Sequence, residues 1–424
     1  MKIKDNAHLT YCTNIHSGES WKEVFASLQK YTLPVKAKIS PSAPFGIGLR
    51  LSNESALTLQ EEGTMAAFKQ WLQENDLYVF TMNGFPYGNF HGKAVKAQVH
   101  APDWLSRERV DYTILLFNLL AELLPEGVTG GISTSPLSYK YWHEGEAESE
   151  AAKRKSCAQL MEVVVHLVQL QQISGKQMHL DIEPEPDGLL ENSADYIDFY
   201  ESYLLKEGLA ILMEKLNCTV LAAENYIREH LQLCYDVCHF SVEFESAEAV
   251  IRGMEEKGLK IGKMQISAAL KCSVFSRDSR AEMVRQLAQF NEPVYLHQAV
   301  LKKQTGELLK FQDLKPGIEA MKNGDFAELR THFHVPIFLS YYQGLSSTQD
   351  DILEAMNLWT EKPFTGHLEV ETYTWDVLPA QLMMDLKQAI QRELSWVLAL
   401  IESKAEKAKG NLIKTVTDET GRSY

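Results

Sequence analysis

Short apolar runs alternate with longer amphipathic stretches along most of the chain. The short runs end in polar or turn-forming residues, which is typical of buried strands. The longer stretches repeat apolar residues three or four positions apart, which predicts helices with one buried face. The predicted strands cover residues 8–14, 45–51, 77–83, 130–136, 178–184, 231–236, 263–267 and 366–373. The predicted helices cover roughly residues 21–31, 61–75, 106–124, 147–174, 195–215, 247–257 and 379–407.

This alternation of strand and helix, repeated about eight times, predicts a parallel sheet closed as a (β/α)₈ TIM barrel. A doubly wound open sheet would usually carry a Gly-rich fingerprint in its first turn, and residues 8–20 have none. We therefore expect one α/β barrel domain over residues 1–409. An insertion at about 268–330, with a hairpin near 304–307, would separate the seventh and eighth strands. Residues 410–424 are predicted to form a flexible polar tail.

Composition narrows the possible partners. The formal net charge is −15 and no long Lys/Arg cluster is present, so binding to nucleic acid is not expected. No apolar run approaches the roughly 20 residues that span a bilayer, and no apolar signal segment follows Met1, so we expect no membrane insertion. The 6 cysteines are scattered without a Cys-x-x-Cys pair. We expect reduced thiols and a cytoplasmic protein of undetermined oligomeric state.

The most informative stretch for chemistry is 234–240, an apolar strand that ends in Asp236 with His239 three residues later. A carboxylate and an imidazole at that spacing can both turn toward one point, as a Zn²⁺ or Mn²⁺ ion requires. The alternative interpretation is a helix N-cap aspartate with a nearby solvent-facing histidine.

Other predicted strands end in the same chemistry, and in a TIM barrel the active site lies at these ends. Glu183 closes the fifth strand, Gln265 lies on the seventh and Glu371 lies on the eighth. His332 and His334, two positions apart, would share one face of an extended segment. Each residue taken alone has an ordinary explanation, as a surface acid or a packed histidine. Together they predict a pocket for a divalent metal ion, with Zn, Mn, Fe or Co favoured over Ca.

The order of these residues resembles the xylose isomerase-like TIM-barrel superfamily, which includes sugar epimerases and endonuclease IV-type enzymes. The resemblance implies that Glu183, Asp236 and Glu371 are carboxylate ligands and that His239 and His334 are imidazole ligands. The remaining positions depart from the superfamily pattern. His332 stands where the endonuclease pattern has Asp, Gln265 stands where many members have His, and the loops after strands three and four offer Asn83 and Ser133-Thr134-Ser135 instead of histidines. A three-metal phosphodiesterase site is therefore not expected.

Three longer strings, at residues 8–16, 331–336 and 370–375, resemble the bacterial metabolite traffic protein EboE family. That family implies the same barrel and an operon linked to the export of a secondary-metabolite precursor. It leaves the reaction open.

Two functions follow from these expectations. The first is metal-dependent isomerisation or epimerisation of a sugar-like or hydroxycarbonyl metabolite, with Glu183 and Glu371 as catalytic base and acid, or Glu185 in place of one of them. The second is a barrel that binds a non-sugar metabolite without turnover; metal-dependent hydrolase or lyase chemistry is a third possibility. The substrate-binding residues predicted for a small molecule are Asn83, Tyr87, Ser135, Tyr373 and Trp375. Phe85 and Phe90 would add to an aromatic mouth, or these rings would simply pack under loops.

Overall fold

The computed structural model describes the chain except for residues 89–95, 274–276, 324–325, 343, 381 and 421–424. For residues 277–279, 323 and 404–420 it describes the backbone alone. Phe90 therefore lies outside the described residues.

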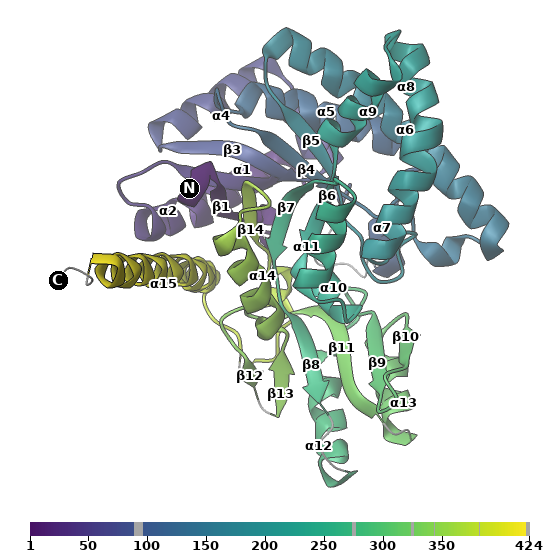
Figure 1. Cartoon of the computed structure of the whole chain (residues 1–424), viewed down its shortest axis with the longest axis vertical. Coiled ribbons are helices and arrows are strands. Elements are labelled where there is room, and N and C mark those ends of the chain that lie inside the picture. The colour runs from purple at the N-terminus through teal and green to yellow at the C-terminus, as the bar shows by residue number, and fades with distance from the viewer. Residues whose placement is uncertain (89–95, 274–276, 324–325, 343, 381, 421–424) are drawn as a thin grey trace.

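Eight parallel strands form a nearly closed barrel in the order β1-β14-β7-β6-β5-β4-β3-β2 (Figure 1). The strands are β1 (His8–Tyr11), β2 (Phe45–Arg50), β3 (Leu77–Asn83), β4 (Gly130–Thr134), β5 (Met178–Ile182), β6 (Leu231–Asp236), β7 (Ile261–Ile266) and β14 (His367–Val370). All eight predicted strands are thus confirmed. The seam between β1 and β2 is joined by a Cys12–Gly48 bridge and by the Thr10 hydroxyl, which donates to Gly46 O at 2.7 Å and accepts from Gly48 N at 3.1 Å.

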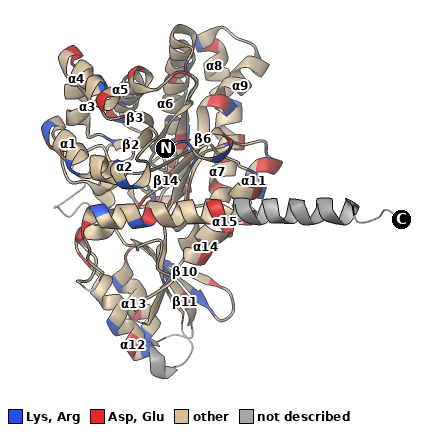
Figure 2. Ribbon diagram, turned by 90° about the vertical axis from the view of Figure 1, so that its left-hand side faces the viewer, with Lys and Arg blue, Asp and Glu red and all other residues tan. Residues whose placement is uncertain are grey.

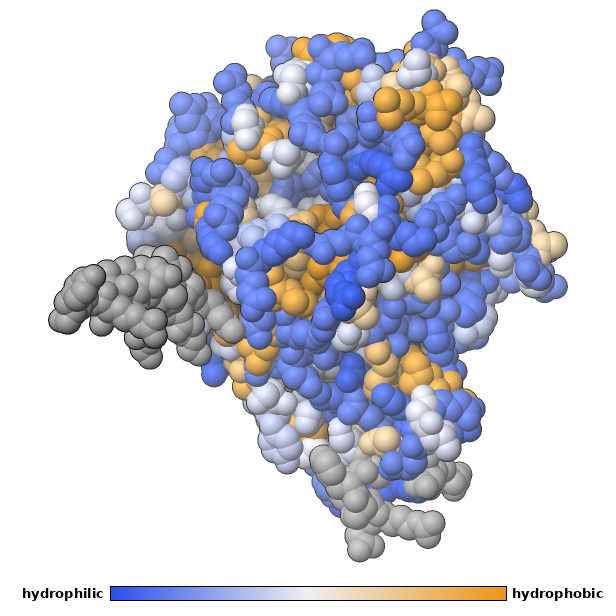
Figure 3. Space-filling model, viewed as in Figure 1, coloured by the Kyte–Doolittle hydropathy of each residue, from blue (hydrophilic) through white to orange (hydrophobic). Residues whose placement is uncertain are grey.

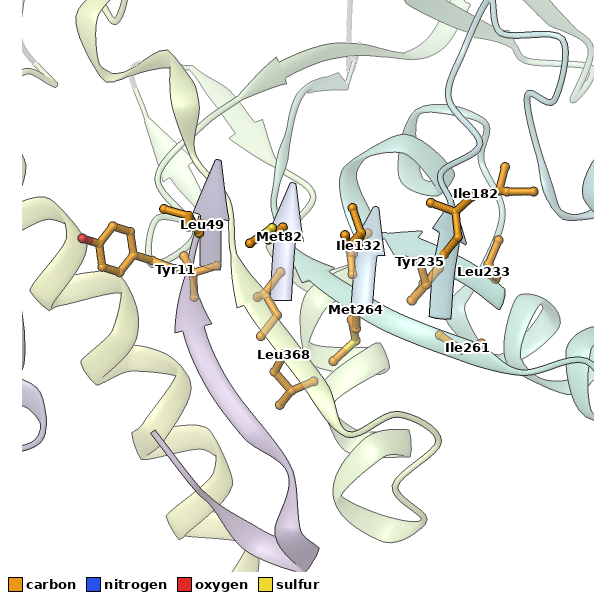
Figure 4. Packing of buried hydrophobic residues seen from close by; sticks show 14 of the residues in the cluster. Tyr11, Leu49, Met82, Ile132, Ile182, Leu233, Tyr235, Ile261, Met264 and Leu368 are labelled. Atoms are coloured by element: carbon orange, nitrogen blue, oxygen red, sulfur yellow. The ribbon is translucent and has the colours of Figure 1, made fainter. Parts of the chain in front are cut away.

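Strand side chains such as Leu49, Ile132 and Leu233 belong to the hydrophobic core, and Figure 4 shows them on separate barrel strands. The barrel interior holds a charged pair, because Lys263 Nζ lies 2.9 Å from Glu369 Oε2 and both side chains are fully buried. Gly48 on β2 leaves the space that Glu369 needs, since an ideal Cβ there would lie 1.8 Å from Glu369 Oε1.

Helices cover the outside of the barrel. They are α1 (Trp21–Ser27), α2 (Leu33–Ile39), α3 (Asn53–Leu59), α4 (Glu62–Glu74), α5 (Arg107–Leu123), α6 (Gly145–Ser174), α7 (Ser193–Phe199), α8 (Leu209–Leu216), α9 (Val220–His230), α10 (Val237–Val242), α11 (Ala247–Glu256), α14 (Gln349–Glu361) and α15 (Leu386–Thr420). A segment over Tyr200–Gly208 with wider helical turns joins α7 to α8. Figure 2 shows acidic and basic residues interspersed along these helices, with no single basic face in that view.

The insertion between β7 and β14 is a second sheet beside the barrel (Figure 1). Its six antiparallel strands have the order β10-β9-β11-β8-β13-β12. They are β8 (Ala269–Ser273), β9 (Ala299–Lys303), β10 (Leu308–Phe311), β11 (Phe326–His334), β12 (Tyr341–Tyr342) and β13 (Leu345–Ser347), accompanied by α12 (Arg277–Leu287) and α13 (Leu314–Asn323). The predicted hairpin joins β9 to β10, with Gly306 at φ 90°.

Some predicted boundaries shift. The first strand ends at Tyr11 because residues Thr13–Ile15 form a tight helical turn. The inserted sheet continues to Ser347, beyond the expected limit near residue 330. The last helix starts at Leu386 and its backbone continues to Thr420, across most of the segment expected to be a tail.

Among the described residues, no helix has the length and apolar character needed to cross a bilayer. Hydrophilic residues cover most of the face in Figure 3, and hydrophobic residues gather there in separate small patches.

Candidate metal centre

Asp236 and His239 are brought together by a direct passage from strand β6 into helix α10. Asp236 caps this helix, because its Oδ1 accepts hydrogen bonds from Cys238 N at 2.8 Å and His239 N at 3.3 Å. Ser267 Oγ donates to the same oxygen at 2.5 Å. The N-cap interpretation of Asp236 is thus confirmed, whereas His239 is 2% exposed and does not face solvent. Asp236 Oδ2 is buried without a hydrogen-bond partner and is left for the site.

Seven buried side chains lie close together, and we call them the carboxylate–histidine cluster: Glu183, Glu185, Asp236, His239, His332, His334 and Glu371. Within it, three sets of three residues each offer ligand atoms within 4.8 Å of one another: Glu183, Asp236 and Glu371; Asp236, His239 and His334; and Glu185, His239 and His332. A fourth set joins Cys238 to His332 and His334. Glu183 and Glu371 directly follow the last residues of β5 and β14. The two histidines of β11 come from the inserted sheet, so the centre lies where the barrel and the insertion meet.

Three histidines are fixed in one tautomer by oxygen acceptors. The Nδ1–H of His239 donates to Pro184 O at 3.1 Å, and that of His334 donates to Glu371 O at 2.8 Å. His332 Nδ1–H donates to Gln298 Oε1 at 2.9 Å, and the Gln298 amide is oriented by its donation to Pro186 O. In the neutral form, each ring therefore keeps its Nε2 as an acceptor, which is the arrangement that histidine ligands to metals use.

The lone pairs of these nitrogens converge. His239 Nε2 and His332 Nε2 are 3.2 Å apart, although both are acceptors in these tautomers. His334 Nε2 is buried without a hydrogen-bond partner. Burial lowers the pKa of His334 to about 4 and, reinforced by the neighbouring His239, lowers that of His332 well below its usual value. Neutral imidazoles are the form that binds a cation.

The carboxylates also need a positive charge between them. Two ionised carboxylates 4.8 Å apart repel each other by roughly 3 kcal/mol at an effective dielectric constant of 20. Burial, together with Asp236 and other nearby carboxylates, accordingly raises the pKa of Glu183 and of Glu371 well above the usual range. Burial opposes ionisation of Asp236 as well, but His239 and His334 hold its pKa below the usual value. The donor set and its unpartnered atoms fit a divalent cation.

Glu371 and Glu183 differ in their hydrogen bonds. Glu371 Oε1 accepts from Asn14 Nδ2 at 2.5 Å and from Asn83 Nδ2 at 3.1 Å, and its Oε2 accepts from Gln265 Nε2 at 2.6 Å. Glu183 Oε2 is buried without such a partner. Three amides thus hold Glu371 in place, while Glu183, which lines the cavity, has one carboxylate oxygen without a hydrogen-bond partner.

The cavity above the cluster has about 560 Å³ of empty volume, part of it open to solvent. Its polar inner end includes Glu183, His239 and Glu371, and its apolar wall includes Phe85 and Tyr295. Asn83 and Tyr373, two of the predicted substrate-binding residues, line it.

Other predicted site residues lie elsewhere. The Tyr87 ring packs edge-on against Tyr112 at 5.0 Å and borders a different surface hollow. Ser135 and Trp375 are buried, and neither lines the cavity. Gln265 Oε1, the atom expected to bind metal, accepts from Cys234 Sγ at 2.7 Å, so the side chain acts here as a donor to Glu371. The ligand role of Gln265 stays a prediction.

Sequence reasoning missed several contributors. Asn14 lies in the stretch 8–16, which indicated only a family resemblance. Gln298 lies in the inserted segment, where no strand end marked it as a site residue. Glu185 was predicted only as a substitute for one of the two catalytic acids, and the structure places it beside His239 and His332. Its Oε1 lies 2.9 Å from His100 Nε2, and its Oε2 lies 3.8 Å from His239 Nε2.

Comparison with known proteins supports the fold. No family model and no curated protein matches the chain. Among solved structures, a xylose isomerase-like TIM barrel protein from Mycobacterium smegmatis in complex with magnesium is similar over 95% of this chain and 99% of that one, with 10% identity and a TM-score of 0.52.

Two further similarities are weaker. The IolI protein with a bound zinc atom is similar over 93% of this chain and 98% of its own, with 11% identity and a TM-score of 0.44. A xylose isomerase domain protein from Planctomyces limnophilus is similar over 85% and 90%, with 10% identity and a TM-score of 0.44. The eight-stranded barrel and the Mycobacterium smegmatis comparison together show that the chain has the xylose isomerase-like TIM-barrel fold.

Proposed function

We propose that the carboxylate–histidine cluster binds a divalent metal ion and that the chain isomerises or epimerises a small hydroxycarbonyl compound. The observation that carries this proposal is the convergence of three fixed imidazole Nε2 atoms with buried, unpartnered carboxylate oxygens. This donor set suits Zn²⁺, Mn²⁺, Fe²⁺ or Co²⁺. When bound, such an ion supplies the positive charge that stabilises negative charge developing on substrate oxygens.

Glu183 is the proposed base. Its Oε2, which has no hydrogen-bond partner in the protein, is available to take a proton from the hydroxyl-bearing carbon next to the substrate carbonyl and to return it to the carbonyl carbon. The hydroxyl proton moves to the former carbonyl oxygen at the same time, and the two transfers interconvert an aldose and a ketose type. Glu371 is held by three amides and is better suited to orienting the substrate and the ion. Epimerisation, in which the proton returns to the opposite face, would require Glu371 as the acid.

The second candidate function is capture of a metabolite without turnover. The apolar wall of the cavity, with Phe85, Tyr295 and Tyr373, favours it because such a surface holds a flat ligand without any chemical step. This proposal includes three further points: membership of the EboE family, a role in export of a secondary-metabolite precursor, and a cytoplasmic location. They are supported by the three resembling strings and by 6 cysteines that are all free thiols in the described chain.

The first experiment measures metal content in protein purified without added metal, for the wild type, Asp236→Asn and His334→Gln. His166→Gln is the matched control, because His166 hydrogen-bonds to Asn118 on the barrel's outer helices. We expect a transition metal in the wild type and control and its loss in the two cluster variants. Equal metal content in all four proteins, or none in any, would contradict the proposal.

The second experiment separates catalysis from capture. Hydroxycarbonyl compounds are incubated with the metal-loaded protein in D₂O, and exchange of the C–H next to the carbonyl is followed by NMR. The wild type should exchange this hydrogen, and Glu183→Gln should retain the metal while slowing exchange by about 10²–10⁴-fold. Metal binding with no exchange of any compound would leave capture as the function.

A further inference from the structure

The cavity is divided into two chemically different parts. Its inner end is polar and belongs to the carboxylate–histidine cluster. Most of the remaining lining surface is apolar and comes from Phe85, Val99, Tyr295, Leu296 and Tyr373. The rings of Tyr295 and Tyr373 meet edge-on at 5.1 Å, and Val99 packs against them. Apart from the Tyr373 hydroxyl, which lies 3.2 Å from His332 Nε2, the wall is mainly apolar and is built largely from segments outside the barrel strands.

Two of the amide side chains that line the cavity, those of Asn83 and Gln298, are already hydrogen-bonded to protein partners. Asn83 donates to Glu371 and accepts from Phe85 N at 3.1 Å. Gln298 donates to Pro186 O at 2.8 Å and accepts from His332. Lys96, at the mouth, donates to Asp313 at 2.7 Å. A sugar is normally recognised by hydrogen bonds to several hydroxyl groups along its chain, and these side chains would have to exchange existing bonds to provide them.

These two observations favour one class of ligand over another. Every hydroxyl group buried against the apolar wall without a partner weakens binding by roughly ten-fold. A planar aromatic group placed there instead gains from burial of its own apolar surface and from edge-to-face contact with Tyr295 and Tyr373.

We infer that the substrate is an aryl hydroxycarbonyl compound, with two adjacent oxygens at the cluster and an aromatic ring against the Phe85–Tyr295–Leu296 wall. This inference rests on the proposed metal centre and deepens it. It names a substrate class different from open-chain sugars.

The test compares two probes with the same –CO–CH₂OH head. One is 2-hydroxy-1-phenylethanone and the other is 1,3-dihydroxyacetone, so they differ in carrying a phenyl or a hydroxymethyl group. Each is titrated into Co²⁺-loaded protein, and binding is followed by the Co²⁺ absorption spectrum. We expect the phenyl compound to bind at least about ten-fold more tightly.

Two wall variants make the preference specific. Tyr295→Ala removes a ring of the wall, and Leu296→Asn makes a half-buried wall position polar at similar volume. Each should reduce the preference for the phenyl compound about three-fold or more and leave dihydroxyacetone affinity nearly unchanged. Tyr341→Ala, an exposed residue of the inserted sheet, is the control and should behave as the wild type.

The outcomes separate this inference from the proposed function. Equal or tighter binding of dihydroxyacetone, or a preference that the wall variants do not change, overturns the aryl substrate and leaves the metal centre standing. A protein that takes up no Co²⁺ overturns both. If Tyr295→Ala fails to fold, Leu296→Asn decides the question alone.

Discussion

Glu371 accepts hydrogen bonds from three side-chain amides, and Gln265 is the amide that reaches its Oε2. Replacing Gln265 by Glu tests whether it orients Glu371 or binds the metal itself, because the two roles predict opposite changes in metal affinity. Gln265→Glu would place a second negative charge beside Glu371 if Gln265 is an orienting donor. We therefore expect Zn²⁺ affinity, measured by competition with a chromophoric chelator, to fall about 10–100-fold. The neutral Gln265→Met is the control for loss of the donor alone. Tighter binding by Gln265→Glu would make Gln265 itself a ligand, as its position in the sequence predicts.

Glu393 on α15 is a second buried acid with a testable consequence. Its Oε1 accepts from Thr372 Oγ1 at 2.7 Å and from Ile337 N at 3.2 Å, yet burial raises its pKa to about 8. The folded state therefore holds a proton that the unfolded state loses near pH 4.5, and stability falls as pH rises between these values. Glu393→Gln keeps both hydrogen bonds without this penalty.

The gain in unfolding free energy of Glu393→Gln over the wild type should be near zero at pH 4 and about 3 kcal/mol at pH 7. Urea denaturation at a series of pH values measures it. A difference that does not change with pH would mean that Glu393 is ionised in the folded protein.

At the scale of single elements, strand β7 depends on a glycine facing the barrel interior. An ideal Cβ at Gly262 would lie 1.9 Å from Asp181 Oδ1, and Asp181 is fully buried and hydrogen-bonded to His179 at 2.6 Å. Gly262→Ala should therefore destabilise the protein by about 1–3 kcal/mol. Gly63 in α4 has no atom within 4 Å of an added Cβ, so Gly63→Ala should be neutral or slightly stabilising. Thermal unfolding of both variants makes the comparison, and equal effects would contradict the packing argument.

The elements that the sequence predicted well are those with strong local patterns. Strands β3 and β6 have the predicted limits because each is an apolar run closed by a polar residue. Helix α9 was missed because only Ala223, Ile227 and His230 are buried along it, which leaves a weak apolar pattern. The inserted sheet could not be predicted as a unit, since strands β8 and β11 pair across more than fifty residues and pairing at that distance leaves no periodic signal.

The same contrast applies to the candidate site. Asp236 and the acids after β5 and β14 could be found because a barrel brings the ends of its strands together. The spacing of His332 and His334 indicated that both could bind a metal. It did not indicate that they lie on a strand of the antiparallel inserted sheet. The amides of Asn14 and Gln298 come from a turn and from the insertion, and their roles depend on tertiary contacts alone.

At the scale of the whole molecule, the carboxylate–histidine cluster lies between two sheets whose strand ladders are separate. Asp236 belongs to barrel strand β6, whereas His332 and His334 belong to β11 of the insertion. An ion held between them would link the two sheets, so its binding free energy would oppose opening of both. Without the ion, the carboxylates of the cluster repel one another, and the Nε2 lone pairs of His239 and His332 face each other at the junction.

Removal of metal by a chelator should therefore lower protection from hydrogen exchange at both sides of the junction together. We expect faster exchange in β11 and at the end of β6 with α10, and little change in α4 on the outer face of the barrel. Hydrogen-exchange mass spectrometry measures all three segments in one experiment, and re-addition of Zn²⁺ should restore the protection. His334→Gln should show fast hydrogen exchange in β11 and at the end of β6 with or without metal. The substitution removes a metal ligand of the inserted sheet and leaves Asp236 of the barrel in place. If the chelator changed exchange in β6 alone, the ion would belong to the barrel and the inserted sheet would have only a packing role at the centre.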